Sequence, residues 1–133
     1  DREQLDWLKG GLQASVASKK PWQVIFGHRP IYSSGIHGDT IEMKKMLLPI
    51  VKNYGVDMVL AGHDHHLELQ ERDGVAHVIS GAGGKSRGTR PWEKPIFVAS
   101  VNGFAHLDFE GTSVTLSFVG ERGNVLYQRS YAK

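Results

Sequence analysis

The chain has 133 residues, of which 40% are hydrophobic and 23% charged, and its formal net charge is +2 at pH 7. This length and composition fit one folded domain with a core of its own. No apolar run approaches the roughly 20 residues that cross a bilayer, and the lysines and arginines are scattered, so we predict neither a membrane nor a nucleic-acid partner. Because cysteine is absent, disulfides, thiolate metal sites and cysteine nucleophiles are excluded.

The first half of the chain alternates helical and strand patterns. The spacing of apolar residues predicts an amphipathic helix over 2–17 and a second helix over 40–54, with a kink or break at Pro49. Two short apolar runs, 22–26 and 56–61, are typical of strands. The strand, helix and strand form a βαβ unit, so both strands are predicted to end at the same edge of a parallel sheet.

After the second strand the pattern changes to antiparallel strands. Segments 67–72 and 75–80 flank Asp73-Gly74, a dipeptide that favours a tight hairpin. The polar stretch 81–100 is predicted to be irregular. Three more strands are predicted at 103–109, 113–119 and 125–131. The predicted fold class is therefore α/β, with a mixed β-sheet and flanking helices.

Two Gly-His dipeptides carry the clearest indication of function. His28 follows the first strand, and His63 and His65 follow the second. Because the strands are predicted to be parallel neighbours, we expect the three imidazoles to lie at one place, which is typical of a metal site. Two arrangements are open: one zinc held by three imidazoles, or the nitrogen half of a two-metal site bridged by a carboxylate.

The acidic residues near these histidines have other expected roles. Asp39 precedes a helix and is expected to be its N-cap. Asp57 begins a strand, and Asp64 can form hydrogen bonds within its own loop. If the site is binuclear, its carboxylates must therefore come from elsewhere.

The remaining histidines divide into two groups. His37 lies in a glycine-flanked loop and could bind a phosphoryl oxygen or protonate a leaving group, or simply be an exposed loop residue. His66 is placed similarly. His77 and His106 alternate within strands, where we expect a structural or surface role.

Other catalytic templates are absent. The glycine-rich segment Gly81–Gly84 lacks the lysine-serine or lysine-threonine end of a P-loop, so it is expected to be a turn, with contact to the mouth of the active site as the alternative. No serine lies in a Gly-x-Ser-x-Gly motif. Arg29, next to His28, could clamp an anion or only turn the chain.

Several motifs resemble the C-terminal half of the calcineurin-like metallophosphoesterases, most closely the small, tartrate-resistant type of purple acid phosphatase. They are Gly27-His28-Arg29-Pro30, Gly62-His63-Asp64-His65, the loop 31–38 that ends in His37-Gly38, and the segments 80–83 and 103–105. The resemblance covers nearly the whole chain. It implies that 1–133 is the C-terminal part of a single metallophosphoesterase domain, a four-layer αββα sandwich whose N-terminal part is absent.

The resemblance also implies a function. His28 and His63 would bind one metal of a binuclear centre, His65 would bind the other, and His37 would contact the substrate phosphate and assist catalysis. The two ions would be iron paired with iron, zinc or manganese. The implied activity is metal-dependent hydrolysis of phosphate esters, as in an acid phosphatase. A secreted or periplasmic location is typical of the family, but the sequence leaves the compartment undetermined.

A partner is implied as well. The family's N-terminal half supplies metal-binding aspartates and a Gly-Asn-His element, and neither occurs here. The chain opens at Asp1 without a methionine, so we expect it to be cut from a longer protein and to pair with the missing portion, or with another copy through an exposed sheet edge. Two alternatives stay open: a non-catalytic fragment that binds metal or anions, and a mononuclear three-histidine zinc hydrolase.

Overall fold

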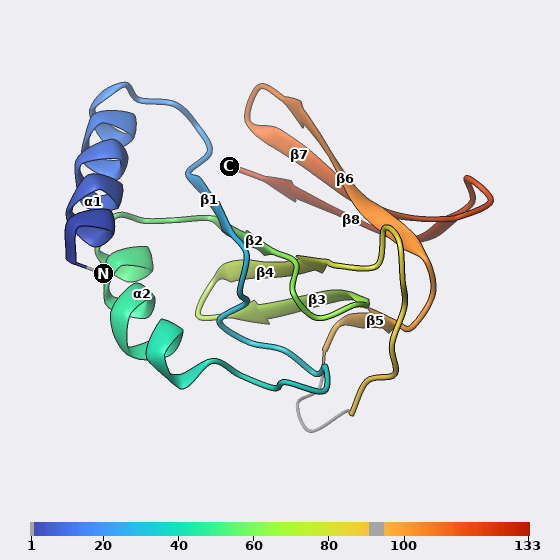
Figure 1. The fold of residues 1–133 in the computed structure, drawn as a ribbon. Coiled ribbons are helices and arrows are strands. Elements are labelled where there is room, and N and C mark those ends of the chain that lie inside the picture. The colour runs from blue at the N-terminus through green and yellow to red at the C-terminus, as the bar shows by residue number, and fades with distance from the viewer. Residues whose placement is uncertain (1, 91–94) are drawn as a thin grey trace.

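The computed structural model describes residues 2–90 and 95–133, which form three layers (Figure 1). Two helices cover one face of a five-stranded mixed sheet, and a three-stranded antiparallel sheet packs on the other face. The elements are α1 (Arg2–Ala17), β1 (Val24–Gly27), α2 (Ile41–Asn53), β2 (Met58–Ala61), β3 (Leu67–Arg72), β4 (Val75–Ser80), β5 (Phe97–Ala99), β6 (Gly103–Glu110), β7 (Ser113–Gly120) and β8 (Val125–Ala132). The predicted α/β class with a mixed sheet is confirmed.

The predicted βαβ unit is present as β1, α2 and β2. Strands β1 and β2 are parallel, and their register pairs Val24 with Met58 and Gly27 with Ala61. Both strands therefore end at the same level of the sheet. This register brings the two loops that carry the Gly-His dipeptides side by side.

Alternation along the strands separates two apolar cores. In β3, Leu67 and Leu69 are fully buried toward the second sheet, where they pack with Leu116 and Phe118 of β7. The core on the opposite face joins the helices to β1 and β2, with Leu12 of α1 among its buried members. Two cores thus hold the sheet between the helices and the second sheet.

The structure differs from the sequence prediction in two places. Helix α2 continues through Pro49 and does not break there. A proline removes one helical hydrogen bond. Pro49 lies on the exposed side of α2, where water can bind the carbonyl group that loses its helical partner. The polar stretch predicted to be irregular contains β5, which pairs with β3. Asp1 and residues 91–94 lie outside the described residues.

Strand β1 lies at one end of the sheet order β1-β2-β4-β3-β5, so one of its edges has no neighbouring strand among the described residues. Phe26 in this strand is 85% exposed. An apolar groove of about 160 Å³ runs beside it, lined by residues that include Trp7, Met43 and Met46. The unpaired edge is therefore also apolar, as the sequence predicts.

Candidate metal and phosphate site

The β1 and β2 loops bring two imidazoles together. His28 follows β1 directly and His63 follows β2 after Gly62, whose N–H donates to the His28 carbonyl at 3.1 Å. The ring nitrogens Nε2 of His28 and Nδ1 of His63 lie 3.0 Å apart. Two imidazole nitrogens that bind one tetrahedral ion at about 2.0–2.1 Å lie about 3.3 Å apart. The spacing of this pair therefore fits two ligands of a single metal ion.

The backbone at His63 is in a conformation that side chains rarely adopt. Its φ is +64°, in the left-handed region that costs a non-glycine residue roughly 1 kcal/mol. Burial lowers the pKa of His63, and the charges of His37, His28 and Arg29 act in the same direction against the opposing effect of Asp64. A lowered pKa favours the neutral imidazole, which is the form that binds metal ions.

His37 completes a cluster of three imidazoles, His28, His37 and His63, which we call the histidine cluster. The His37 ring centroid lies 4.6 Å from that of His63, and its Nε2 lies 3.9 Å from Asp64 Oδ1. A recess of about 380 Å³ adjoins the cluster and is lined by His37, His63 and Arg29. Two groups able to donate hydrogen bonds to an anion, an imidazole and a guanidinium, thus face one recess.

His65 has a different environment. Among the described residues no ring contact joins it to the histidine cluster, and its Nδ1 is buried without a hydrogen-bond partner. The described residues contain no group of three or more histidine, cysteine or acidic side chains that could hold a metal ion. The structure thus brings His28 and His63 together, and the convergence of His65 with them stays a prediction. Its unpartnered nitrogen fits a ligand to a separate ion.

Two buried carboxylates anchor the loop that carries His37. Asp64 accepts a hydrogen bond from the Ser33 hydroxyl, and Glu68 accepts two from Ser34, from its backbone N–H at 2.9 Å and its hydroxyl at 2.6 Å. Both carboxylates are almost fully buried, with exposures of 1% and 0%. The position of the His37 loop is therefore set by hydrogen bonds to the β2–β3 connection and to β3.

Glu68 is the centre of this network. It also accepts hydrogen bonds from His66 at 2.5 Å and from Gln70 at 2.6 Å. Burial raises the pKa of Glu68, but the hydrogen bonds from His66, Ser34 and Gln70 outweigh it and hold the pKa below its usual value. Sequence reasoning missed Glu68. The available signal was the alternation Leu67-Glu68-Leu69-Gln70, which predicts a charged side chain facing the helices.

The acidic residues have partly different roles from those predicted. The N-cap of α2 is Thr40, without a side-chain cap hydrogen bond, so the expected N-cap role of Asp39 is wrong. Asp39 accepts a hydrogen bond from the Ser33 N–H at 2.9 Å and pairs with Lys44. Asp57 accepts one from the Gln23 N–H at 2.7 Å. Asp39 thus stabilises the loop, and Thr40 is the N-cap residue of α2.

The glycine-rich segment has a specific packing role. A Cβ atom at Gly81 would lie 1.9 Å from the Asp64 carbonyl oxygen, whereas one at Gly83 would meet none of the described residues within 4 Å. Gly81 therefore permits close contact between the end of β4 and the loop that carries His63. This close contact involves Asp64, which is next to His63 in the chain. It agrees with the alternative prediction, that the glycine-rich segment contacts the mouth of the site.

Three other histidines lie outside the histidine cluster. His66 is 1% exposed and bound to Glu68. His77 is 4% exposed, and burial is the main cause that lowers its pKa to about 4. His106 is exposed on β6. The structural or surface roles predicted for His77 and His106 agree with these positions.

The fold and the paired Gly-His loops define the class of protein. A family model for calcineurin-like phosphoesterases matches residues 1–67, the segment that contains His28, His37, His63 and His65. The chain belongs to the calcineurin-like phosphoesterase family.

Relatives with known names refine this comparison. The chain is 31% identical to human tartrate-resistant acid phosphatase type 5, over 96% of this chain and 42% of the relative. It is 32% identical to purple acid phosphatase 17 of Arabidopsis thaliana, over 88% of this chain and 37% of that protein. The chain thus spans about two fifths of the length of these relatives, which are acid phosphatases.

Solved structures show the same fold. The structure of GAP50, the anchor in the inner membrane complex of Plasmodium, matches 98% of this chain and 42% of its own, with a TM-score of 0.89 and 29% identity. A purple acid phosphatase from yellow lupin seeds matches 98% of this chain and 28% of its own, with a TM-score of 0.87 and 22% identity. Within the described residues, every helix is too short or too polar to cross a membrane.

Proposed function

We propose that the chain supplies the histidine ligands of a binuclear metal centre that hydrolyses phosphate esters. The observation that carries this proposal is the 3.0 Å separation of His28 Nε2 and His63 Nδ1, from loops that follow two parallel strands. Membership of the phosphoesterase family and the acid phosphatases among the relatives support the reaction class.

The histidines have separate roles in this proposal. His28 and His63 hold one ion, and His65, whose Nδ1 is buried and unpartnered, holds the second. Bound metal ions, with iron paired with iron, zinc or manganese as the proposed composition, would neutralise phosphate oxygens and make water acidic enough to serve as nucleophile. The remaining ligands are aspartates and other groups of the N-terminal portion.

His37 and Arg29 bind the substrate phosphate. Both line the recess beside the histidine cluster, and the His37 ring lies 4.6 Å from that of His63. The guanidinium of Arg29 can donate two hydrogen bonds to phosphate oxygens. The His37 imidazolium can donate to the ester oxygen and give its proton to the leaving alkoxide. Substrate orientation and leaving-group protonation are thus assigned to this chain.

The same proposal assigns the chain to the C-terminal part of one metallophosphoesterase domain. The chain spans 42% of the human relative, and β1 has an unpaired edge flanked by the exposed ring of Phe26. An unpaired apolar strand edge is a surface on which another strand can pair. The N-terminal portion of the domain is the occupant we propose, and a second copy of this chain is the alternative.

Hydrolysis of p-nitrophenyl phosphate tests the function. The chain is assayed alone and co-expressed with the N-terminal portion of its parent reading frame, in the presence of iron, zinc or manganese. We expect activity only with both portions, a loss of at least 100-fold in His63→Ala, and no change in the exposed control His106→Ala. Full activity from the chain alone, with one metal bound, would instead establish the mononuclear zinc hydrolase.

A non-catalytic role is the second candidate, because GAP50, an anchor in a membrane complex, has the same fold at a TM-score of 0.89. In that role the chain would contribute a folded binding surface and no metal chemistry. The two candidates are separated by the assay above: a well-folded two-portion protein that binds no metal and hydrolyses no ester supports the binding role.

A further inference from the structure

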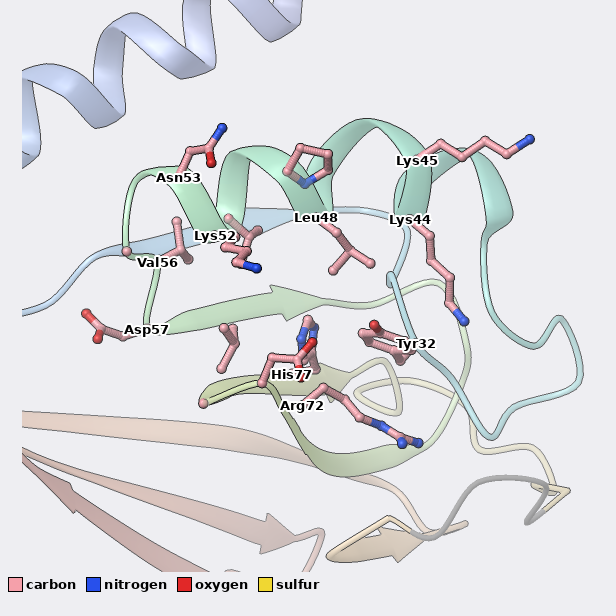
Figure 2. Close-up of a pocket in the computed structure, with 16 residues that line it drawn as sticks. Tyr32, Lys44, Lys45, Leu48, Lys52, Asn53, Val56, Asp57, Arg72 and His77 are labelled. Atoms are coloured by element: carbon pink, nitrogen blue, oxygen red, sulfur yellow. The ribbon is translucent and has the colours of Figure 1, made fainter.

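A second cavity lies away from the histidine cluster, between α2 and the β3–β4 hairpin (Figure 2). Its volume is about 950 Å³. Small-molecule sites commonly have volumes of about 300–1,000 Å³. The side chains of His28, His37, His63 and His65 do not line it. The cavity, which we call the α2 cavity, is therefore large enough for a small organic ligand and separate from the candidate metal ligands.

The floor of the α2 cavity contains an unsatisfied polar group. His77 of β4 is 4% exposed and lines the cavity, and its Nδ1 is buried without a hydrogen-bond partner in the described part of the chain. Figure 2 shows the His77 side chain between α2 and the hairpin, next to Tyr32. The two rings meet edge-on with centroids 4.8 Å apart. Since buried polar groups are normally hydrogen-bonded, a ligand that enters deeply enough to reach this nitrogen would supply the missing partner.

The wall of the cavity is mainly positive. Lys44, Lys45, Lys52 and Arg72 line it, against the two acidic residues Asp57 and Asp73. The Asp57 carboxylate already accepts a hydrogen bond from the ammonium of Lys133 at 2.7 Å. This contact offsets one of the two negative charges, so the wall carries an excess of cationic groups.

The cations are not equivalent. Lys52 forms no ion pair among the described residues, and Figure 2 shows its side chain pointing from α2 into the cavity. Lys45, seven positions earlier on the same helix, points outward in Figure 2. Lys44 reaches over the Tyr32 ring, with its ammonium 4.6 Å from the ring centroid. Lys52 is therefore the cation best placed to meet a ligand, and Lys20, an exposed lysine that does not line the cavity, is its control.

One side of the cavity is apolar. Leu48 of α2, Val56 and Val75 are among the lining residues, and the two valines are 3% and 9% exposed. A simple inorganic anion would leave this side without contacts. A ligand that fills the cavity must therefore combine a negative group with an apolar body.

We propose that the α2 cavity binds a small organic anion, with its acid group between Lys52 and His77 and its apolar body against Leu48, Val56 and Val75. The acid group accepts hydrogen bonds from the Lys52 ammonium and from the His77 ring. A carboxylate, a sulfonate and a phosphate monoester share this chemistry. The site goes beyond the proposed hydrolysis, since it uses none of the groups assigned to that reaction.

Isothermal titration calorimetry with naphthalene-1-sulfonate tests the proposal. The chain is co-expressed with the N-terminal portion, so that the apolar edge of β1 is covered and does not compete for the probe. We expect one binding site per chain. The neutral analogue 1-naphthylmethanol and the small anion methanesulfonate should each bind at least tenfold more weakly, because each lacks one of the two required parts.

Three variants identify the site. Lys52→Gln and His77→Phe should each weaken binding about tenfold, the effect of losing one hydrogen bond to a charged group. Lys20→Gln, at an exposed lysine outside the cavity, should leave the affinity within twofold. His77→Phe retains an aromatic ring against Tyr32, and thermal unfolding verifies that each variant is folded. Absence of binding by the folded wild-type protein, equal binding of methanesulfonate, or equal affinity in all three variants would overturn the proposal.

Discussion

Glu68 holds Ser34 by two hydrogen bonds, one from the Ser34 backbone N–H at 2.9 Å and one from its hydroxyl at 2.6 Å. Ser34 belongs to the loop that carries His37, and Glu68 lies in the middle of β3. The strand and the loop are thus joined by a carboxylate with 0% exposure. The positioning of His37 in the recess depends on a residue that does not itself line it.

Replacement of Glu68 should destabilise the protein and displace the His37 loop. In Glu68→Ala the donors of Ser34, His66 and Gln70 lose their buried acceptor, which should lower the free energy of unfolding by about 3 kcal/mol or more. Glu68→Gln retains one acceptor oxygen and should cost less. Urea unfolding measures both changes. Equal stability of Glu68→Ala and wild type would show that the network does not hold the loop.

Gly81 should tolerate no side chain. In Gly81→Ala the new Cβ would lie 1.9 Å from the Asp64 carbonyl oxygen, so the backbone of one segment must move. We expect a loss of about 2 kcal/mol or more in the free energy of unfolding, as for other overpacked sites. Gly83→Ala is the matched control, because its Cβ meets none of the described residues within 4 Å. Similar unfolding curves for the two variants would contradict the close approach at Gly81.

His77 should make stability depend on pH. Its pKa is lowered from 6.5 to about 4, mainly by burial and next by the charge of Arg72, with Asp39 and Asp73 acting in the opposite direction. Between these values the unfolded state binds the proton and the folded state does not. The contribution of neutral His77 to the free energy of unfolding is therefore fully present above the pKa of the unfolded state. It is lost as the pH falls toward the pKa of the folded state.

The expected size of this effect is about 2 kcal/mol between pH 7.5 and pH 5. Urea unfolding at the two pH values measures it as a difference between wild type and His77→Phe. The variant lacks a titrating group at this position. On acidification its free energy of unfolding should therefore fall by about 2 kcal/mol less than that of wild type. His106→Gln, at an exposed position, is the control and should behave as wild type does. Equal acid sensitivity of His77→Phe and wild type would show that His77 is not the responsible group.

Phe26 should drive association of the chain when the N-terminal portion is absent. Its ring is 85% exposed on a strand with an unpaired edge, so self-pairing would bury both the ring and the backbone groups. Phe26→Ser should shift the chain toward monomer in sedimentation velocity. Val16→Ser, on α1 and 48% exposed, removes an apolar side chain away from the sheet edge and should not. Equal association of the two variants would exclude β1 as the interface.

The sequence was a good guide to the strands and helices but not to their irregular connections. The hairpin at Asp73-Gly74 and its flanking strands have the predicted bounds, because period-two alternation and a turn dipeptide act locally. Strand β5 was missed, since a three-residue strand in a polar stretch is defined by its pairing with β3 and not by its own pattern.

The candidate site was predictable only in part. The pairing of His28 with His63 follows from two parallel strands that end in register, which the βαβ pattern implies. The positive φ of His63 is a backbone feature that no sequence pattern signals. The role of Glu68 depends on a loop folding over β3, a tertiary contact that strand alternation alone does not reveal.

The most direct test of the central claim is the metal content of the chain co-expressed with its N-terminal portion, measured by plasma mass spectrometry. We expect two metal ions per chain in the wild-type protein and a loss of about one ion in the double variant His28→Ala/His63→Ala. The control His106→Ala should keep both. An unchanged metal content in the folded double variant, or a wild-type protein without metal, would contradict the assignment of these histidines as ligands.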